Sequence, residues 1–211
     1  MTSLRIGRAT IVGVDLGAAV ALRLAASRPA RVHGLVLISP PAPGRGRGDD
    51  LAEMGRIAAT RLFEATRGML GAAAWLRPLL EKSVASPDAM PEKLVTRYSA
   101  PFVGADGVRH LQALANAVSD DDMGDVDLSK VTARTLVLRG EQDAWCSPAD
   151  ATRLATAITG AELRTVPTAG LVVIPRTGHT VTSEEPAAFN AALADFIASS
   201  EVGRWLAHKK P

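Results

Sequence analysis

Apolar runs of strand length alternate with apolar segments of helical length near the start of the chain. Residues 9–14 (ATIVGV) and 32–39 (VHGLVLIS) are almost continuously apolar, which is typical of parallel strands buried on both faces. Between them, residues 16–28 are apolar nearly all round, as expected of a helix that is covered on both sides. A strand, a helix and a second strand in so few residues predict a right-handed βαβ unit.

The same rhythm returns in the second half of the chain. Ser147, Pro148 and Asp150 have the spacing of a helix N-terminus, with Ser147 as the capping residue and Asp150 completing a capping box. The final helix is amphipathic, with Phe189 and Phe196 on one face. The predicted elements are a strand at 133–140, a helix at 147–158, a strand at 169–175 and a helix at 184–199.

The middle of the chain, residues 51–124, lacks this alternation and predicts helical pieces. Prolines interrupt the pattern at Pro78, Pro87, Pro91 and Pro101. We therefore expect an all-helical insertion that adds no strand to the sheet. The expected division is an α/β core formed by residues 1–44 and 125–211, with a helical lid insertion at 45–124.

Two segments beside this insertion allow more than one interpretation. Residues 40–50 (PPAPGRGRGDD) contain a Gly-Arg repeat, but the repeat is short and internal, which favours a flexible exit loop over a nucleic-acid-binding tail. Residues 120–127 (DDDMGDVD) carry enough carboxylates for a metal ion, but their spacing matches no ligand pattern. A solvated acidic hinge is the favoured interpretation there.

Composition excludes several classes of protein. The 211 residues are 47% apolar and 22% charged, which is ordinary for a globular domain, and the net charge of +2 does not indicate a nucleic-acid partner. No apolar run approaches the roughly 20 residues that a membrane span needs. The single cysteine, Cys146, excludes an internal disulfide, and the N-terminus has no apolar core of a secretory signal. We expect a cytoplasmic protein.

The turn after the first predicted strand carries the first candidate for chemistry, Asp15. A dinucleotide-binding turn would need a glycine where Asp15 stands, because a carboxylate there repels the pyrophosphate. A nucleophile elbow fits better: Gly13 and Gly17 flank Asp15 at two residues on each side, which lets the backbone turn sharply and present the side chain. A plain helix-capping aspartate is the structural alternative.

Two further polar residues follow predicted strands. Asp143 comes just after the strand at 133–140, and His179 comes after the strand at 169–175. Because the carboxyl ends of parallel strands share one edge of a sheet, we expect both to lie on the same edge as Asp15. The structural alternatives are a turn residue for Asp143 and a packed loop histidine for His179. No base pattern surrounds Cys146, so a small buried apolar residue is the favoured interpretation there.

With these three segments in chain order, the sequence resembles the α/β-hydrolase family. The resemblance rests on GVDLGAAVALRLAASRPARVHGLVLISPP, TLVLRGEQD and VIPRTGHTVTSEEPAAF, and covers nearly the whole chain. It implies an α/β-hydrolase-type parallel sheet with a helical lid, Asp15 as nucleophile, Asp143 as triad acid and His179 as base. The backbone N–H of Leu16 is implied as one oxyanion donor. No metal and no cofactor are implied.

The elbow residue leaves two functional hypotheses open. An aspartate resembles the haloalkane dehalogenase and epoxide hydrolase branches, but Leu16 replaces the tryptophan common there, and Tyr98 is the only tyrosine. The flanks resemble serine esterases and C–C bond hydrolases equally well. The first hypothesis is a hydrolase of a small organic substrate with Asp15 as nucleophile. The second is a catalytically impaired esterase or lactonase relative that binds a small apolar ligand or completes a partner chain's sheet.

The resemblance also predicts an incomplete sheet. In the family several strands and a His-Gly type loop precede the elbow, whereas here the elbow lies at residue 15. We therefore expect the N-terminal strands of the fold to be absent and the strand at 9–14 to be an exposed edge. The expected partners are a small-molecule substrate and a partner chain or second copy that covers this edge, with no nucleic acid and no membrane.

Overall fold

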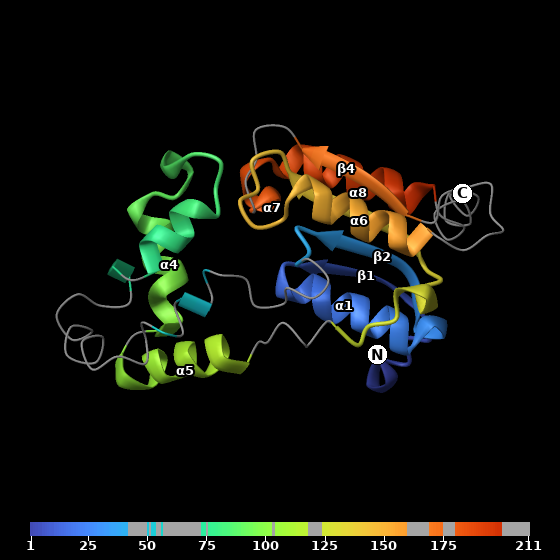
Figure 1. Ribbon diagram of the computed structural model, residues 1–211, viewed down its shortest axis with the longest axis horizontal. Helices are drawn as coiled ribbons and strands as arrows, with labels where there is room; N and C mark the ends of the chain where they lie inside the picture. Colours follow the sequence, from blue (N-terminus) through green and yellow to red (C-terminus); the bar gives the residue numbers. More distant parts are fainter. Residues whose placement is uncertain are drawn as a thin grey trace.

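The computed structural model describes residues 1–41, 50, 52–53, 56, 73–74, 76–102, 104–117, 124–159, 169–174 and 180–199. Its centre is a four-stranded parallel sheet in the order β1-β2-β3-β4, the order of the strands along the chain (Figure 1). The strands are β1 (Ala9–Val14), β2 (Val32–Ile38), β3 (Arg134–Gly140) and β4 (Ala169–Ile174). All four carboxyl ends therefore lie at one edge of the sheet.

The helices that pack on this sheet follow the predicted boundaries closely. They are α1 (Leu16–Ser27), α6 (Pro148–Thr159) and α8 (Pro186–Ala198). The predicted capping of α6 is confirmed, since the Asp150 N–H donates to Ser147 Oγ at 3.1 Å and Ser147 Oγ donates to the Asp150 carboxylate at 2.7 Å. A short helix that the pattern did not predict, α7 (Val181–Glu184), precedes α8. Within the described ranges, no helix is both long and apolar enough to cross a membrane.

One face of the sheet is covered by α1 and α6. Leu35, Leu37 and Val137 point to this face and are completely buried. The α6 helix adds Leu154 and Ile158 to the same cluster, whereas α1 contributes mainly alanines. Small side chains allow α1 to lie close to the strands, and the burial of each large side chain stabilises the fold by about 1.5–3 kcal/mol.

The opposite face is covered by α8. Val36, Ile38, Leu136 and Leu138 alternate along β2 and β3 with the residues of the first face, and they pack against Phe196 of α8. This period of two explains why residues 35–38 of β2 and 136–138 of β3 are apolar at consecutive positions: each of these side chains has a helix above it or below it.

The sheet is less well covered along β1, which lies at one end of the strand order among the described strands. Ile11 packs against the cluster under α1, but Val12 and Val14 point to the α8 face and remain 45% and 42% exposed. The edge and one face of β1 thus present apolar side chains and backbone groups that further protein can cover.

Between β2 and β3 the chain forms what we call the helical segment, the described residues from 50 to 117. It contains helical residues 76–82, α4 (Glu92–Ser99) and α5 (Gly104–Ala117), with short 3-10 helices at Pro87–Ala89 and Ala100–Phe102. Figure 1 shows this segment in green, beside the sheet. Val84, Met90 and Val95 form a small core of its own. None of these described residues belongs to a strand.

The exposed edge predicts self-association of the 211-residue chain. Val12→Lys places a charge on the exposed face of β1 and should shift the chain toward monomer, because a lysine disfavours strand addition at an edge. Val20→Lys is the matched control, since Val20 is a 69% exposed valine on α1. Size-exclusion chromatography with light scattering over a range of concentrations measures the shift. Equal association of both variants would exclude β1 as the contact.

Candidate active site at the carboxyl edge of the sheet

The turn between β1 and α1 holds Asp15 in a strained conformation. Its φ of 50° and ψ of −121° lie where non-glycine residues are rare. The Asp15 N–H donates to the Ile38 carbonyl at 3.0 Å, and its own carbonyl accepts from the Ala18 N–H at 2.8 Å. The side chain is exposed and makes no capping hydrogen bond to the helix. The turn thus has the strained strand-to-helix backbone that the glycine spacing predicts, and the bond that defines a capping aspartate is missing.

The two glycines that flank Asp15 have different roles. A Cβ built on Gly13 would lie 2.3 Å from the Gly17 carbonyl oxygen and 2.6 Å from Ala18 Cα, so the first turn of α1 packs directly on β1 at this point. A Cβ on Gly17 would meet nothing within 4 Å. The motif spacing suggests that glycine is needed at both positions. The structure shows a steric requirement for glycine at Gly13 and none at Gly17.

Asp143 lies in the loop after β3 and is 7% exposed. Its Oδ1 accepts the backbone N–H groups of Trp145 at 2.9 Å and Cys146 at 3.0 Å. Because a carboxylate has two oxygens, each able to accept more than one hydrogen bond, these turn bonds are compatible with a second role toward a histidine. The structure thus gives Asp143 the turn-forming role and leaves the acid role open.

A buried arginine, Arg139, which the sequence analysis did not single out, holds the loop that carries Asp143. Arg139, near the end of β3, is 3% exposed; its Nε donates to the Cys146 carbonyl at 2.9 Å and its Nη2 to the Glu141 carbonyl at 3.3 Å. The two bonds join both ends of the loop that carries Asp143. The available signal was a cation directly after the apolar run 136–138 of the strand, a residue type that is buried only when it has partners.

Cys146 is buried, as predicted, with 1% of its surface exposed. Burial, reinforced by the negative charge of Asp143, raises the pKa of its thiol to about 12. The reactive form of a cysteine is the thiolate, so Cys146 is an inert packing residue at neutral pH.

The third predicted residue, His179, lies outside the described residues. What the sheet brings together is Asp15, after β1, and Asp143, after β3, with β2 between them. Neighbouring strands lie about 4.8 Å apart, so the ends of β1 and β3 are separated by roughly 10 Å at this edge. The strand that precedes His179 in the chain is β4, which lies beside β3 and ends at the same edge of the sheet. Helix α7 begins at Val181, two residues after His179 in the chain. The position of the histidine side chain stays a prediction.

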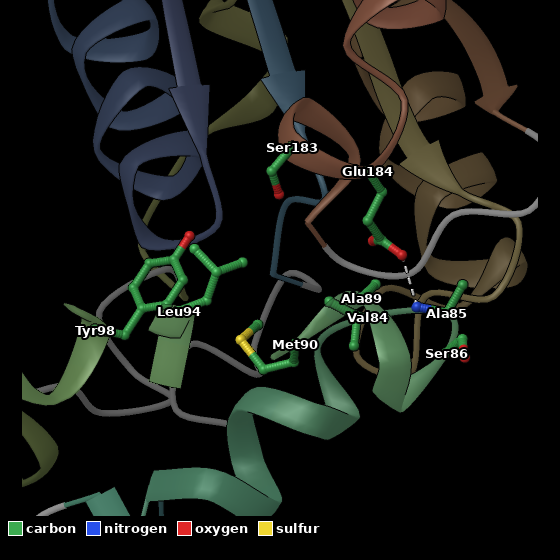
Figure 2. A pocket seen from close by; sticks show the side chains of 9 residues that line it. All are labelled: Val84, Ala85, Ser86, Ala89, Met90, Leu94, Tyr98, Ser183 and Glu184. Carbon is green, nitrogen blue, oxygen red and sulfur yellow. Dashed lines mark hydrogen bonds between the residues drawn. The ribbon is translucent and has the colours of Figure 1, made fainter. Parts of the chain in front are cut away.

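A cavity of about 360 Å³ lies between the helical segment and α7 (Figure 2). Its lining is mostly apolar, and its residues with polar side chains are Ser86, Tyr98, Ser183 and Glu184. The volume is in the range of small-molecule sites. The sequence left the substrate-binding residues open, because the helical segment brings together residues distant in the chain. The lining residues are Val84, Ala85, Ser86, Ala89, Met90, Leu94, Tyr98, Ser183 and Glu184.

The helical segment also contacts the loop that carries Asp143. The indole N–H of Trp145 donates to Asp50 Oδ2 at 2.5 Å, and the same carboxylate is paired with Lys82. Burial by itself would raise the pKa of the Asp50 carboxyl, but the hydrogen bonds from Lys82 and Trp145 outweigh it and hold the pKa below its ordinary value. Asp50 therefore stays ionised and ties the segment to this loop. Across the described part of the chain, no group of three or more possible ligands is placed to hold a metal ion.

Comparison with known proteins identifies relatives over most of the chain. A sequence model of the alpha/beta hydrolase family matches residues 1–192. A protein of Variovorax paradoxus (strain S110) that carries the name carbamate hydrolase RutD is 31% identical over 196 residues. That alignment includes 90% of this chain and 66% of the relative, so the chain spans slightly less than two thirds of the relative's length.

Solved structures have the same fold. The meta-cleavage product hydrolase CumD of Pseudomonas fluorescens IP01 superposes with a TM-score of 0.69 at 20% identity, over 93% of this chain and 67% of CumD. Est816, described as an N-acyl homoserine lactone degrading enzyme, superposes with a TM-score of 0.62 at 26% identity, over 92% of this chain and 70% of Est816. These likenesses establish the α/β-hydrolase-type parallel sheet.

The packing at Gly13 predicts a difference between two alanine substitutions. Gly13→Ala should lower the free energy of unfolding by about 1–3 kcal/mol, because the new methyl group overlaps the first turn of α1. Gly17→Ala should be neutral or slightly stabilising, since it fills open space in a helix. Urea denaturation of both variants measures the difference. Equal effects would contradict the close approach of α1 to β1.

The raised pKa of Cys146 predicts slow alkylation. At pH 8 a thiol with a pKa of about 12 is ionised in only about 1 molecule in 10,000, and burial blocks the reagent as well. The folded chain should therefore stay unlabelled by iodoacetamide while the urea-unfolded chain is labelled, as followed by intact mass. Equal labelling rates in the two states would place the thiol at the surface.

Proposed function

Because the chain belongs to the α/β-hydrolase family, we propose that it acts as a hydrolase on a small organic substrate. In this proposal Asp15 is the nucleophile, Asp143 the acid and His179 the base. Residues 45–124 form the lid over a core of 1–44 and 125–211. The observation that carries the proposal is the strained backbone of Asp15, which presents an exposed carboxylate at the start of α1. A helix N-terminus stabilises negative charge there.

The first step is a nucleophilic substitution at a carbon atom of the substrate. A carboxylate oxygen of Asp15 forms a bond to an electrophilic sp³ carbon, such as that of an alkyl halide or an epoxide. The bond from this carbon to the halide or epoxide oxygen breaks, and the leaving group takes the electron pair. The product is an ester of Asp15.

The second step is hydrolysis of that ester. His179, oriented by Asp143, takes a proton from a water molecule, and the hydroxide attacks the ester carbonyl of Asp15. The backbone N–H of Leu16 stabilises the oxyanion that forms. Collapse of this intermediate releases the alcohol and restores the carboxylate. The step needs no metal and no cofactor.

The cavity between the helical segment and α7 is the proposed substrate site. Val84, Met90 and Leu94 supply an apolar surface, and α7 follows directly after the segment that contains His179. A small and largely apolar molecule fits this lining better than a highly charged one, because desolvating a charge without a partner is unfavourable.

The relatives favour a second candidate function. A protein named as a carbamate hydrolase and an N-acyl homoserine lactone degrading enzyme are 31% and 26% identical to this chain, and both names describe cleavage at an acyl carbon. In this alternative, Asp15 stands where an esterase or lactonase has serine. The chain then binds a small apolar ligand with little turnover, or completes the sheet of a partner chain at β1. The exposed edge of β1 supports the role of completing a sheet, and it does so equally for a partner chain and for a second copy of this chain.

Trapping of the ester tests the first proposal. His179→Gln should accumulate a covalent adduct on Asp15, because the first step proceeds and the second lacks its base. Intact-protein mass spectrometry after incubation with alkyl halides and epoxides detects the added mass, and peptide mapping locates it. The double variant with Asp15→Asn is the control and should carry no adduct. An adduct at another residue would remove Asp15 from the mechanism.

Substitution of the elbow residue separates the two candidates. Asp15→Ser should abolish adduct formation with alkyl halides if Asp15 is the nucleophile. If the chain is instead an esterase relative that has lost its serine, the same variant should gain hydrolysis of p-nitrophenyl esters over the wild type. Initial rates on both substrate classes measure the outcome. A gain of esterase activity would favour the second candidate.

A further inference from the structure

Trp145 donates a hydrogen bond from each of its two N–H groups, and the two bonds lead to different parts of the molecule. The backbone N–H donates to Asp143 Oδ1 at 2.9 Å, within the loop between β3 and α6. The indole N–H donates to Asp50 Oδ2 at 2.5 Å, in the helical segment. One residue therefore joins the helical segment to the carboxylate of Asp143.

The Asp50 end of this connection is held in place by the helical segment. Lys82 forms an ion pair with the same carboxylate oxygen that accepts the indole N–H. Lys82 comes two residues before Val84, which belongs to the small core of the helical segment. Hydrogen bonds to an ionised acceptor are stronger than bonds between neutral groups. The indole of Trp145 thus has a charged acceptor whose place is set by the helical segment.

The rest of the loop is held independently of the helical segment. Arg139 donates to the Cys146 carbonyl at 2.9 Å and to the Glu141 carbonyl at 3.3 Å. Cys146 is also buried in the cluster under α1 and α6. Because these contacts fix both ends of the loop, loss of the bond to Asp50 should leave the loop folded and should loosen mainly Trp145.

We propose that Trp145 is a positioning residue for Asp143, through which the helical segment sets the orientation of this carboxylate. The inference rests on the proposed function, in which Asp143 is the acid that orients the base. Asp143 Oδ1 accepts two backbone N–H groups, from Trp145 and Cys146, so its place depends on where both groups lie. The buried Cys146 holds one of them, and the bond to Asp50 holds the other.

A misoriented acid has a distinct kinetic signature. In the proposed mechanism the attack by Asp15 does not use Asp143, whereas hydrolysis of the ester does. A weaker hold on Trp145 should therefore slow the decay of the ester and lower kcat and KM together. Loss of a group that only binds substrate would raise KM and leave the decay of the ester unchanged.

The experiment compares Trp145→Phe, Asp50→Asn and Asp50→Ala in the full chain. Trp145→Phe keeps an aromatic ring and the backbone N–H but removes the indole donor. A displacement of about 1 Å can cost roughly 100-fold in rate, and Arg139 limits the displacement, so Trp145→Phe and Asp50→Ala should slow ester decay by about 5- to 20-fold. Asp50→Asn keeps an acceptor oxygen and should lose less. Glu81→Gln is the matched control, because Glu81 pairs with Arg77 within the helical segment, and it should behave as wild type.

A double-mutant cycle measures whether the effect passes through Asp143. Asp143→Asn keeps an oxygen that can accept the two backbone N–H groups but lacks the charge of the acid. Trp145→Phe should therefore slow ester decay much less in the Asp143→Asn background than in the wild type. Intact-protein mass, measured over time after removal of excess alkyl halide, follows the decay. Equal slowing in both backgrounds overturns the positioning role.

Hydrogen exchange measured by mass spectrometry supplies a readout that does not depend on turnover. In Trp145→Phe and Asp50→Ala, exchange should rise in the peptides that cover residues 143–147, which contain both N–H donors, and in Glu81→Gln it should not. Unchanged exchange there overturns the coupling. Faster exchange with unchanged ester decay overturns the positioning role while the proposed function stands. If neither the wild type nor His179→Gln forms an ester, the proposed function fails and the positioning role fails with it.

Discussion

The close approach of α1 to β1 at Gly13 is the constraint on which the rest of the site depends. With no Cβ at this position, the first turn of α1 lies directly on the strand. The direction of the chain must therefore reverse within a single residue, and Asp15 adopts the strained backbone conformation, with a positive φ, that this reversal requires. Its N–H is then bonded to the end of β2 and its carbonyl to the start of α1, so the side chain stands out from the edge of the sheet.

The two central strands, β2 and β3, could be predicted from the sequence because their middle residues are buried on both faces. Val36 and Leu37 have helices on opposite sides, which makes the strand continuously apolar and easy to recognise. The helical segment was recognisable by its change of pattern, but its details were not. Pro87 and Pro91 lie at helix ends as expected, whereas Pro78 lies within helical residues 76–82. Helix α7 is too short to produce a periodic signal.

The candidate site was predictable only in part. The glycine spacing around Asp15 indicated its turn, because the backbone there is determined locally. The contacts of Asp50 with Trp145 and of Glu184 with Ala85 join residues about 100 positions apart in the chain, and no local pattern encodes them. Arg139 was visible as a charge directly after the apolar run 136–138, yet its two carbonyl partners depend on the path of the following loop.

The placement of the helical segment between two adjacent strands also has a consequence for the folding process. β1, α1 and β2 are close in the chain and can pair early, whereas β2 finds β3 only after the whole stretch from Ile38 to Arg134 has closed into a loop. The entropy of loop closure grows only slowly with length, by about 0.6 kcal/mol for each doubling. A segment with its own small core can therefore change in length at little thermodynamic cost, provided that its ends still meet at the edge of β2 and β3.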